Sequence, residues 1–449
     1  MKPKYFCSLL LCGIALASIG LRTRQDKGLV IHEWGTFTSV QGSDGVLLAW
    51  KPLETSKLPG FVHDWQKPGL NRRSAHWSVF GKGSMVTLQR METPIIYFYT
   101  DKEQTVDLSV GFPQGLITEW FPQVREIGPS IALTSTTVLS MDKALHKVGV
   151  SPSFTLASLF DEKPTTNSLV HWSHLEIFPA KDHPKLASLI PSGSSGNHYF
   201  AAHDTDSAYV RTPSLSKTNP APEYEKFLFY RGAGSFATPL ITLMTNNLVI
   251  VTNTSKEPLK HLFVLTVHNH QGKFVYLDQL APGEQRNISA SQQEVLQPLT
   301  AVARQIGNQM ESSLIKEGLY QREARAMVNT WNSSWFEEEG VRVLYVLPRN
   351  WTDTTLPINI NPQPRELVRV MVGRAELIPP VAEQQLTEQL VKAGNGDVQA
   401  RKQVQLTLKT FGRFAEPAFY RALAKATPKV TPKTNIASLA SLLSDSQFE

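Results

Sequence analysis

Cysteine is almost absent from this 449-residue chain, because its two cysteines, Cys7 and Cys12, both lie within the first twelve residues. If the leading segment is removed on export, the mature chain has no disulfide, no cysteine nucleophile and no thiolate metal ligand. With 41% hydrophobic residues, a chain of this length can bury a core that needs no crosslink. An exported, cysteine-free protein is more typical of bacteria than of eukaryotic secretion.

Long apolar runs are also scarce, and the run over residues 6–19 is too short to cross a bilayer comfortably. It follows Lys2 and Lys4 and contains the small-residue pattern Ala15-Leu16-Ala17. These features predict a signal peptide over residues 1–20 and a secreted or periplasmic mature chain without a stable membrane span. The alternative is an uncleaved N-terminal membrane anchor.

Neither sign of charge forms a block. The formal charge is +6, which falls to +4 without Lys2 and Lys4, and no five basic residues occur in a row. Nucleic-acid binding requires a basic stripe or patch, so the sequence argues against a nucleic-acid partner.

The signatures of several enzyme classes are missing. The chain has no Gly-x-Ser-x-Gly elbow, no phosphate-binding loop and no Gly-x-Gly-x-x-Gly turn, and His32-Glu33 is not followed by the second histidine of a zincin helix. Whether the protein is an enzyme is therefore left open by its motifs.

Strand patterns dominate the first two thirds of the chain. Residues 94–100 are apolar on both faces, residues 106–110 alternate between apolar and polar side chains, and residues 116–121 follow a Gly-Phe-Pro-Gln-Gly turn. This succession predicts three adjacent antiparallel strands. Residues 247–253 and 262–268 predict a hairpin further along.

Helical patterns begin near Ser291. Residues 291–316 contain good helix formers, and apolar side chains from Tyr320 to Trp335 recur on one face of an amphipathic helix. Residues 341–347 and 367–372 alternate again as strands.

These patterns predict a mainly β fold, with antiparallel β-sandwich-like sheets and an α-helical C-terminal region, α+β overall. The expected divisions are a signal peptide (1–20), a β-rich domain (21–222), a sandwich-like segment with two inserted helices (223–378), a helical segment (379–426) and a flexible tail (427–449).

Five charged residues in the strand-rich part are candidates for catalysis: His32, Glu33, Arg90, Glu92 and Glu119. Carboxylates next to aromatic side chains can have a raised pKa and act as general acids. The same pattern arises whenever a charged residue points outward from a strand. Convergence of these five side chains in space is the catalytic hypothesis.

Two further clusters suggest a divalent metal, although no cofactor is firmly implied. His268 and His270 share a face if they lie on one strand, but the same residues suit an exposed hairpin turn. His174 and Glu176 form a similar pair, for which a partly exposed strand is the alternative. Asp204 and Asp206 resemble a short calcium loop.

Tryptophan is concentrated before residue 173, where exposed rings would be able to stack on sugars. Trp50, Trp65 and Trp77 lie in a loop-like stretch and are the best candidates for exposure; burial in the core is the alternative.

The opening stretch from Ile31 to Val40 (IHEWGTFTSV) and the run from Arg90 to Tyr99 resemble those of a group of uncharacterised secreted proteins of environmental bacteria, as do Phe227 to Gly234 and Ser334 to Phe336. This resemblance implies export and a bacterial source. It carries over no activity, cofactor or site residue.

Together these features favour a secreted or periplasmic binding or structural protein that recognises a glycan or protein surface. The alternative is a metal- or carboxylate-dependent hydrolase that acts on envelope or environmental polymers. A cluster of histidine and carboxylate side chains in one concave pocket would favour the enzyme.

Overall fold

The computed structural model describes residues 28–53, 58–64, 86–128, 168–193, 198–214, 221–245, 248–289, 296–430 and 435–444. The predicted signal peptide and two of the candidates for exposure, Trp65 and Trp77, lie outside the described residues.

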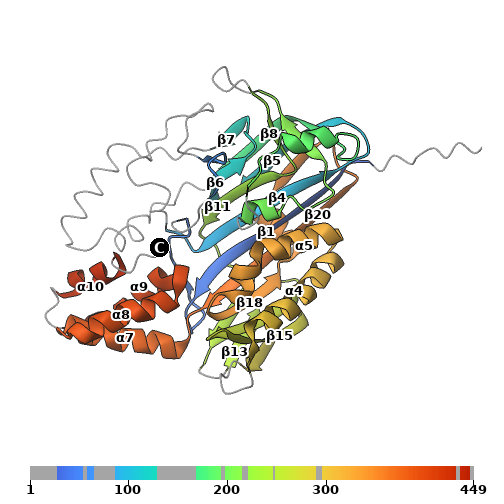
Figure 1. Ribbon diagram of the computed structural model, residues 1–449. Coiled ribbons are helices and arrows are strands. Elements are labelled where there is room, and N and C mark those ends of the chain that lie inside the picture. The colour runs from blue at the N-terminus through green and yellow to red at the C-terminus, as the bar shows by residue number, and fades with distance from the viewer. Residues whose placement is uncertain are drawn as a thin grey trace, which may run out of the picture.

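The centre of the molecule is a large sheet of eleven strands (Figure 1). Its order, with β2 (Leu47–Leu48) paired to β1 off the main path, is β17 (Gln297–Pro298), β15 (Gln271–Leu280), β14 (Leu259–His268), β18 (Gly340–Val346), β20 (Glu366–Leu377), β1 (Val30–Gln41), β4 (Gln89–Tyr99), β11 (Leu228–Gly234), β6 (Gly115–Phe121) and β3 (His63–Asp64).

The first and last long strands of the chain meet in the middle of this sheet. β1 and β20 pair in parallel over their whole lengths, whereas β1 and β4 pair antiparallel. Strands from both sides of the predicted boundary at residues 222/223 therefore lie side by side in one continuous sheet. The segments 21–222 and 223–378 share that sheet and its core.

Two smaller sheets cover one face of the large sheet. One has the order β10 (Glu223–Glu225), β9 (Tyr209–Thr212), β8 (Ser168–Phe178), β5 (Gln104–Phe112) and β19 (Ile358–Asn361), with β7 (Glu126–Gly128) paired to β8. The other has the order β12 (Leu240–Met244), β13 (Leu248–Asn253) and β16 (Gln285–Ser289). Apolar side chains from all three sheets form a single core cluster between them, as in a β-sandwich.

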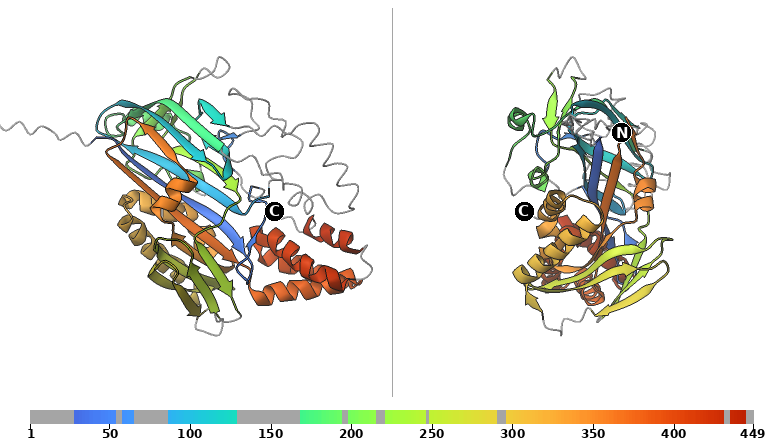
Figure 2. Two further views of the ribbon diagram at one scale, coloured as in Figure 1. Left: turned by 180° about the vertical axis from the view of Figure 1, so that it is seen from behind. Right: turned by 90° about the vertical axis from the view of Figure 1, so that its right-hand side faces the viewer.

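Helices cover part of the opposite face, as the right-hand view of Figure 2 shows. They are α4 (Leu299–Lys316) and α5 (Gln321–Asn332), and α5 continues into a π-helical turn (Ser333–Glu337). α5 buries Ala324, Met327 and Trp331, and Trp335 of the π-helical turn is also buried, which confirms the predicted amphipathic helix. The short α3 (His198–Ala201) packs against α5. α6 (Arg349–Thr355) lies between β18 and β19 in the sequence.

A bundle of C-terminal helices lies beside the end of β1 (Figure 1). It comprises α7 (Pro380–Gly394), α8 (Val398–Thr410), α9 (Ala415–Ala426) and α10 (Asn435–Ser444), and it has its own apolar cluster, which includes Trp50. The prediction of a loose tail after residue 426 is wrong for α10, because Leu439 and Leu442 are buried in this cluster.

The predicted strands exist, but two of their predicted pairings are wrong. β4 and β6 belong to the large sheet with β11 between them, whereas β5 belongs to the six-stranded sheet, so residues 94–121 form no meander. β13 pairs with β12 and β16, and the real hairpin joins β14 to β15. The fold class is confirmed as mainly β with antiparallel sheets and a helical C-terminal region. Among the described helices, none is both long and apolar enough to span a membrane.

Candidate functional site

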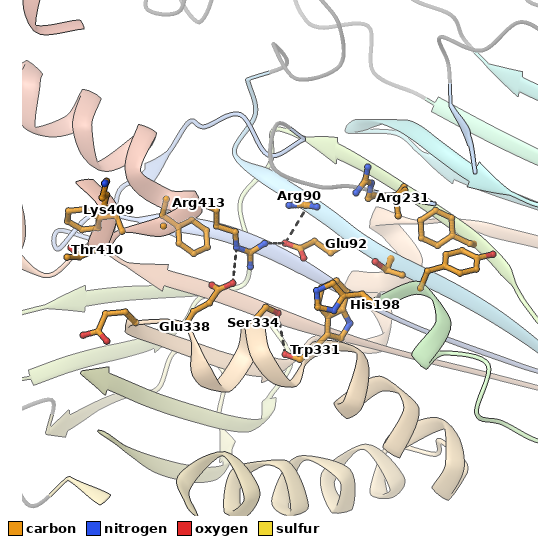
Figure 3. A pocket seen from close by; sticks show the side chains of 18 residues that line it. Arg90, Glu92, His198, Arg231, Trp331, Ser334, Glu338, Lys409, Thr410 and Arg413 are labelled. Carbon is orange, nitrogen blue, oxygen red and sulfur yellow. Dashed lines mark hydrogen bonds and ion pairs between the residues drawn. The ribbon is translucent and has the colours of Figure 1, made fainter. Parts of the chain in front are cut away.

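A cavity of about 640 Å³ opens where the large sheet, α5 and the helical bundle meet (Figure 3). Its wall includes residues of β4 and β11, of α3, of α5 with its π-helical turn, and of the turn between α8 and α9. The residues that matter for its chemistry are Arg90, Glu92, His198, Tyr199, Phe229, Arg231, Trp331, Glu338, Lys409, Phe411, Arg413 and Phe414.

Irregularities in the central strands direct charged side chains into this cavity. Arg90 and Glu92 are two residues apart on β4 and share a face, while Met91 between them is buried in the sandwich core. β11 is bulged at Gly232, where an added Cβ would lie 2.2 Å from the carbonyl oxygen of Leu116. Bulges of this kind re-aim neighbouring side chains, here that of Arg231.

Ion pairs connect β4 to the helical bundle through Arg413. Its Nη1 donates to Oε1 of Glu92 at 2.9 Å, and its Nε lies 3.5 Å from Oε1 of Glu338. Glu338 also accepts a 2.6 Å hydrogen bond from Arg374. Figure 3 shows Arg413 between the two carboxylates. Glu92, Arg413 and Glu338 thus line the cavity as charges of alternating sign, and Arg374 lies behind them.

These ion pairs extend beneath the cavity into the sheet. Glu376 accepts hydrogen bonds from Arg374 at 2.7 Å and from Arg342 at 3.0 Å. On β11, next to β4, Arg231 forms a two-point pair with Glu119, at 3.0 Å through Nε and 2.5 Å through Nη2. Bidentate pairs of this geometry are among the strongest charge-assisted hydrogen bonds.

Counted over the described residues, the network contains one more cation than anion. Its members among the described residues are five arginines and four glutamates, namely Arg90, Arg231, Arg342, Arg374 and Arg413 with Glu92, Glu119, Glu338 and Glu376. Eight of these charges are joined by ion pairs of 3.0 Å or less. Arg90 is the ninth.

Arg90 is the least satisfied member of the network. It is 5% exposed, its Nε lies 3.7 Å from Oε1 of Glu92, and that nitrogen has no hydrogen-bond partner. Burial, together with the positive charges of Arg231 and Arg413, lowers the pKa of Arg90 to about 10 despite the opposing effect of Glu92. Nε and Nη2 of Arg413 also lack a hydrogen-bond acceptor. Buried donors of this kind are normally hydrogen-bonded, which sets Arg90 and Arg413 apart from the closely paired arginines of the network.

The carboxylates of the cavity are held in the ionised form. Burial alone would raise the pKa of Glu92, but Arg413, Arg90 and Arg374 outweigh it and lower that pKa to about 2. Burial likewise opposes Arg374, Arg413 and Arg342 at Glu338, whose pKa also falls to about 2. A general acid needs a pKa near the working pH, so neither carboxyl suits that role at neutral pH.

Aromatic side chains form the rest of the wall on two sides. The rings of Trp331 and His198 stack with centroids 5.6 Å apart. At the turn between α8 and α9, the guanidinium of Arg413 lies 4.9 Å from the ring centre of Phe414, and Arg374 lies 5.1 Å from it. The cavity therefore combines a cationic floor with apolar walls.

The five predicted catalytic residues do not converge. Arg90 and Glu92 line the cavity, and Glu119 is one ion pair away from it through Arg231. His32 and Glu33 are neighbours on β1 and therefore point to opposite faces of the sheet. The hypothesis of a single five-residue centre is wrong, because one strand cannot direct adjacent side chains to the same side.

His32 and Glu33 each have a structural set of partners. Nδ1 of His32 lies 2.7 Å from Oε2 of Glu323. The same carboxylate oxygen also accepts a hydrogen bond from the backbone N–H of Tyr320. On the other face, Glu33 accepts hydrogen bonds from Arg369 and Tyr230, both at 2.5 Å. These contacts tie β1 to α5, β20 and β11.

The predicted metal pairs are not brought together with further ligands. Asn269 and His270 have positive φ and form the two-residue turn between β14 and β15, whereas His268 ends β14 and contacts Glu339 at 2.7 Å. His268 and His270 therefore do not share a strand face. Within the described part of the chain, no three histidine, aspartate or glutamate side chains are grouped as metal ligands.

The other acidic clusters have protein partners. His174 has positive φ at a bulge of β8 and is mostly exposed, while Glu176 forms an ion pair with Arg211. Arg322 is the cation between Asp204 and Asp206. These residues bind neighbouring side chains of this chain.

Trp50, for which both exposure and burial were open, is buried: it is 2% exposed and packs against Phe414. The important residues that were not predicted are Arg231, Glu338, Arg374 and Arg413. The sequence contains one signal for them, because Arg90-Met-Glu92 and Arg374-Ala-Glu376 are two Arg-x-Glu patterns within otherwise apolar strands.

Comparison with known proteins adds no family assignment. No protein-family model and no curated protein matches the chain. Among solved structures, the chain is similar to the yeast delta-COP-I mu-homology domain, at 6% identity over 79% of this chain and 99% of that chain, with a TM-score of 0.26. The same domain in complex with a Dsl1 WxWxV peptide gives 7% identity, the same coverages and a TM-score of 0.27. Similarity at these TM-scores does not bear on function.

Proposed function

We propose that this chain is an exported bacterial binding protein, and that the cavity beside Arg90 holds an anionic group of its ligand. The observation that supports this is the network around the cavity, in which the described part of the chain contributes five arginines and four glutamates. An uncompensated buried charge costs several kcal/mol, and an anion from the ligand would remove that cost.

Binding is favoured over the alternative of a carboxylate-dependent hydrolase. Hydrolysis by paired carboxyl groups needs one of them protonated near the working pH. Glu92 and Glu338 both have a pKa of about 2, which makes them partners for arginine rather than proton donors. We expect the ligand in the periplasm or outside the cell, because the predicted signal peptide and the resemblance to secreted bacterial proteins both suggest export.

Anion binding is tested by thermal unfolding of the purified protein. Sodium acetate, sodium benzoate and inorganic phosphate are titrated at constant ionic strength against sodium chloride. At least one anion should raise the unfolding midpoint of the natural protein, because a ligand at 100 times its Kd adds about 2.7 kcal/mol of stability.

Two variants locate the effect. Arg90→Met should abolish the rise, while Arg286→Met removes an exposed arginine of β16 and should preserve it. An equal rise in all three proteins would place anion binding elsewhere. No rise with any of the anions in the natural protein would contradict the proposal.

Export is tested separately. The full chain is expressed in a bacterium, the periplasmic fraction is collected, and the N-terminus of the recovered protein is sequenced. A start near residue 21 supports export and cleavage; recovery of the intact chain from the cytosol contradicts both.

A further inference from the structure

The cavity has room for much more than a small inorganic anion. Its volume of about 640 Å³ lies within the range of pockets that enclose ligands the size of a drug molecule. An anion placed at Arg90 would occupy only the floor, so the rest of the ligand must fit the walls.

The charge balance of the floor favours a single negative charge. The network members that the structure describes have an excess of one cation, and Oε1 of Glu92 lies 3.7 Å from Nε of Arg90. Glu338, which directly follows the π-helical turn, lines the same space. A second negative charge on the bound group would meet these ionised carboxylates, and like charges at short range repel. A carboxylate monoanion fits better than a phosphate dianion.

The walls favour an apolar body over a sugar. Among the described residues, four hydroxyl groups line the cavity, those of Thr93, Tyr199, Ser334 and Thr410. Three of them already donate within the chain: Tyr199 to Glu225, Ser334 to the carbonyl of Trp331 and Thr410 to that of Thr407. A sugar presents several hydroxyl groups that each need a polar partner, and most of these described hydroxyls are already engaged.

Aromatic rings approach the cavity from two sides instead. Phe229, Tyr199 and Trp331 come from the sheet and the helices on its face. Phe411 and Phe414 come from the turn between α8 and α9. Rings on two walls provide a slot for a flat apolar group.

We infer that the ligand is a monocarboxylate carried on a flat apolar ring, with the carboxylate at Arg90 and Arg413 and the ring between the aromatic walls. This inference rests on the proposed function of the cavity as an anion-binding site. Guanidinium groups match a carboxylate in geometry as well as charge, and Arg90 and Arg413 both line the cavity.

Titration calorimetry with five probes tests this ligand class: benzoate, acetate, glucuronate, inorganic phosphate and the neutral benzyl alcohol. Benzoate should bind at least tenfold more tightly than acetate, glucuronate or phosphate, and benzyl alcohol should not bind measurably. Arg90→Met should abolish benzoate binding, and Arg286→Met should leave it within twofold of the natural value.

A second variant tests the ring. Phe411→Leu at the partly buried turn should weaken benzoate binding roughly 2- to 10-fold, the range expected for one aromatic contact, and leave acetate binding within twofold. Equal losses for benzoate and acetate would overturn the placement of the ring.

The outcomes separate this inference from the proposed function. If phosphate or glucuronate binds as tightly as benzoate and needs Arg90, the cavity is an anion site and the ring carboxylate is wrong. If none of the anions binds, both proposals fail together.

Discussion

Replacing Arg90 with methionine should make the unliganded protein more stable, although the side chain is large and buried. Burial and neighbouring cations lower its pKa to about 10 from 12.5, which means that the charged form is less favourable in the folded chain than in water. That displacement corresponds to about 3 kcal/mol at neutral pH. Methionine keeps the apolar stem, so we expect the free energy of unfolding to rise by roughly 1 to 3 kcal/mol.

The matched comparison is Arg231→Met, one strand away. Arg231 is also buried, but it makes the two-point pair with Glu119, and its removal leaves a buried carboxylate without that partner. Breaking such a pair costs about 3 to 5 kcal/mol. Urea denaturation of both variants in chloride buffer measures the two changes. A loss of stability in Arg90→Met as large as that in Arg231→Met would refute the reasoning, because it would show that the charge of Arg90 is already compensated.

Three further predictions follow from the same contacts. The pKa of Glu92 is about 2 in the folded chain and 4.5 ordinarily, so its stabilising contribution of about 3 kcal/mol should be complete above pH 4.5 and disappear as the pH falls toward 2. The difference in urea midpoint between the natural protein and Glu92→Gln should therefore shrink over that pH range. A difference that stays constant with pH would contradict this prediction. Glu323→Ala should lower the free energy of unfolding by about 3 kcal/mol, because His32, the hydroxyl of Tyr99 and the N–H of Tyr320 lose a shared acceptor. A decrease of less than about 1 kcal/mol in chemical denaturation would contradict this role. Lys409→Met at the exposed rim should slow benzoate association in stopped-flow measurements and flatten its dependence on salt, with little change in dissociation; an effect confined to dissociation would contradict steering.

Local patterns in the sequence predict individual strands and helices better than they predict which strands pair with one another. The two-residue alternation of β5 and the helical repeat of α5 depend on which face is buried, which is visible in a short window. The pairing of β1 with β20 is not visible there, because parallel strands require a long crossover and these two are joined by most of the chain. The predicted meander failed for the same reason: β11, from a distant segment, lies between β4 and β6.

Of the residues that form the site, only those on strands could be predicted from the sequence. Arg90 and Glu92 stand out as charges within an apolar strand, and they do line the cavity. The residue that completes their pairing, Arg413, is 321 positions from Glu92 on a helical turn with no distinguishing pattern. His32 stood out equally, and its partner Glu323 is 291 positions away on the other side of the sheet. Composition marks a buried charge, whereas the fold alone decides which buried charges face a common space.

The central claim is that Arg90 is the contact between the cavity and an anion, and nuclear magnetic resonance of the arginine side chains tests it most directly. In protein labelled with ¹⁵N-arginine, the Nε–H resonance of Arg90 is assigned by its loss in Arg90→Met. Titration with benzoate should move this resonance in a saturable way and leave that of Arg286 in place. A saturable response of other arginines with the Arg90 resonance unmoved would contradict the account.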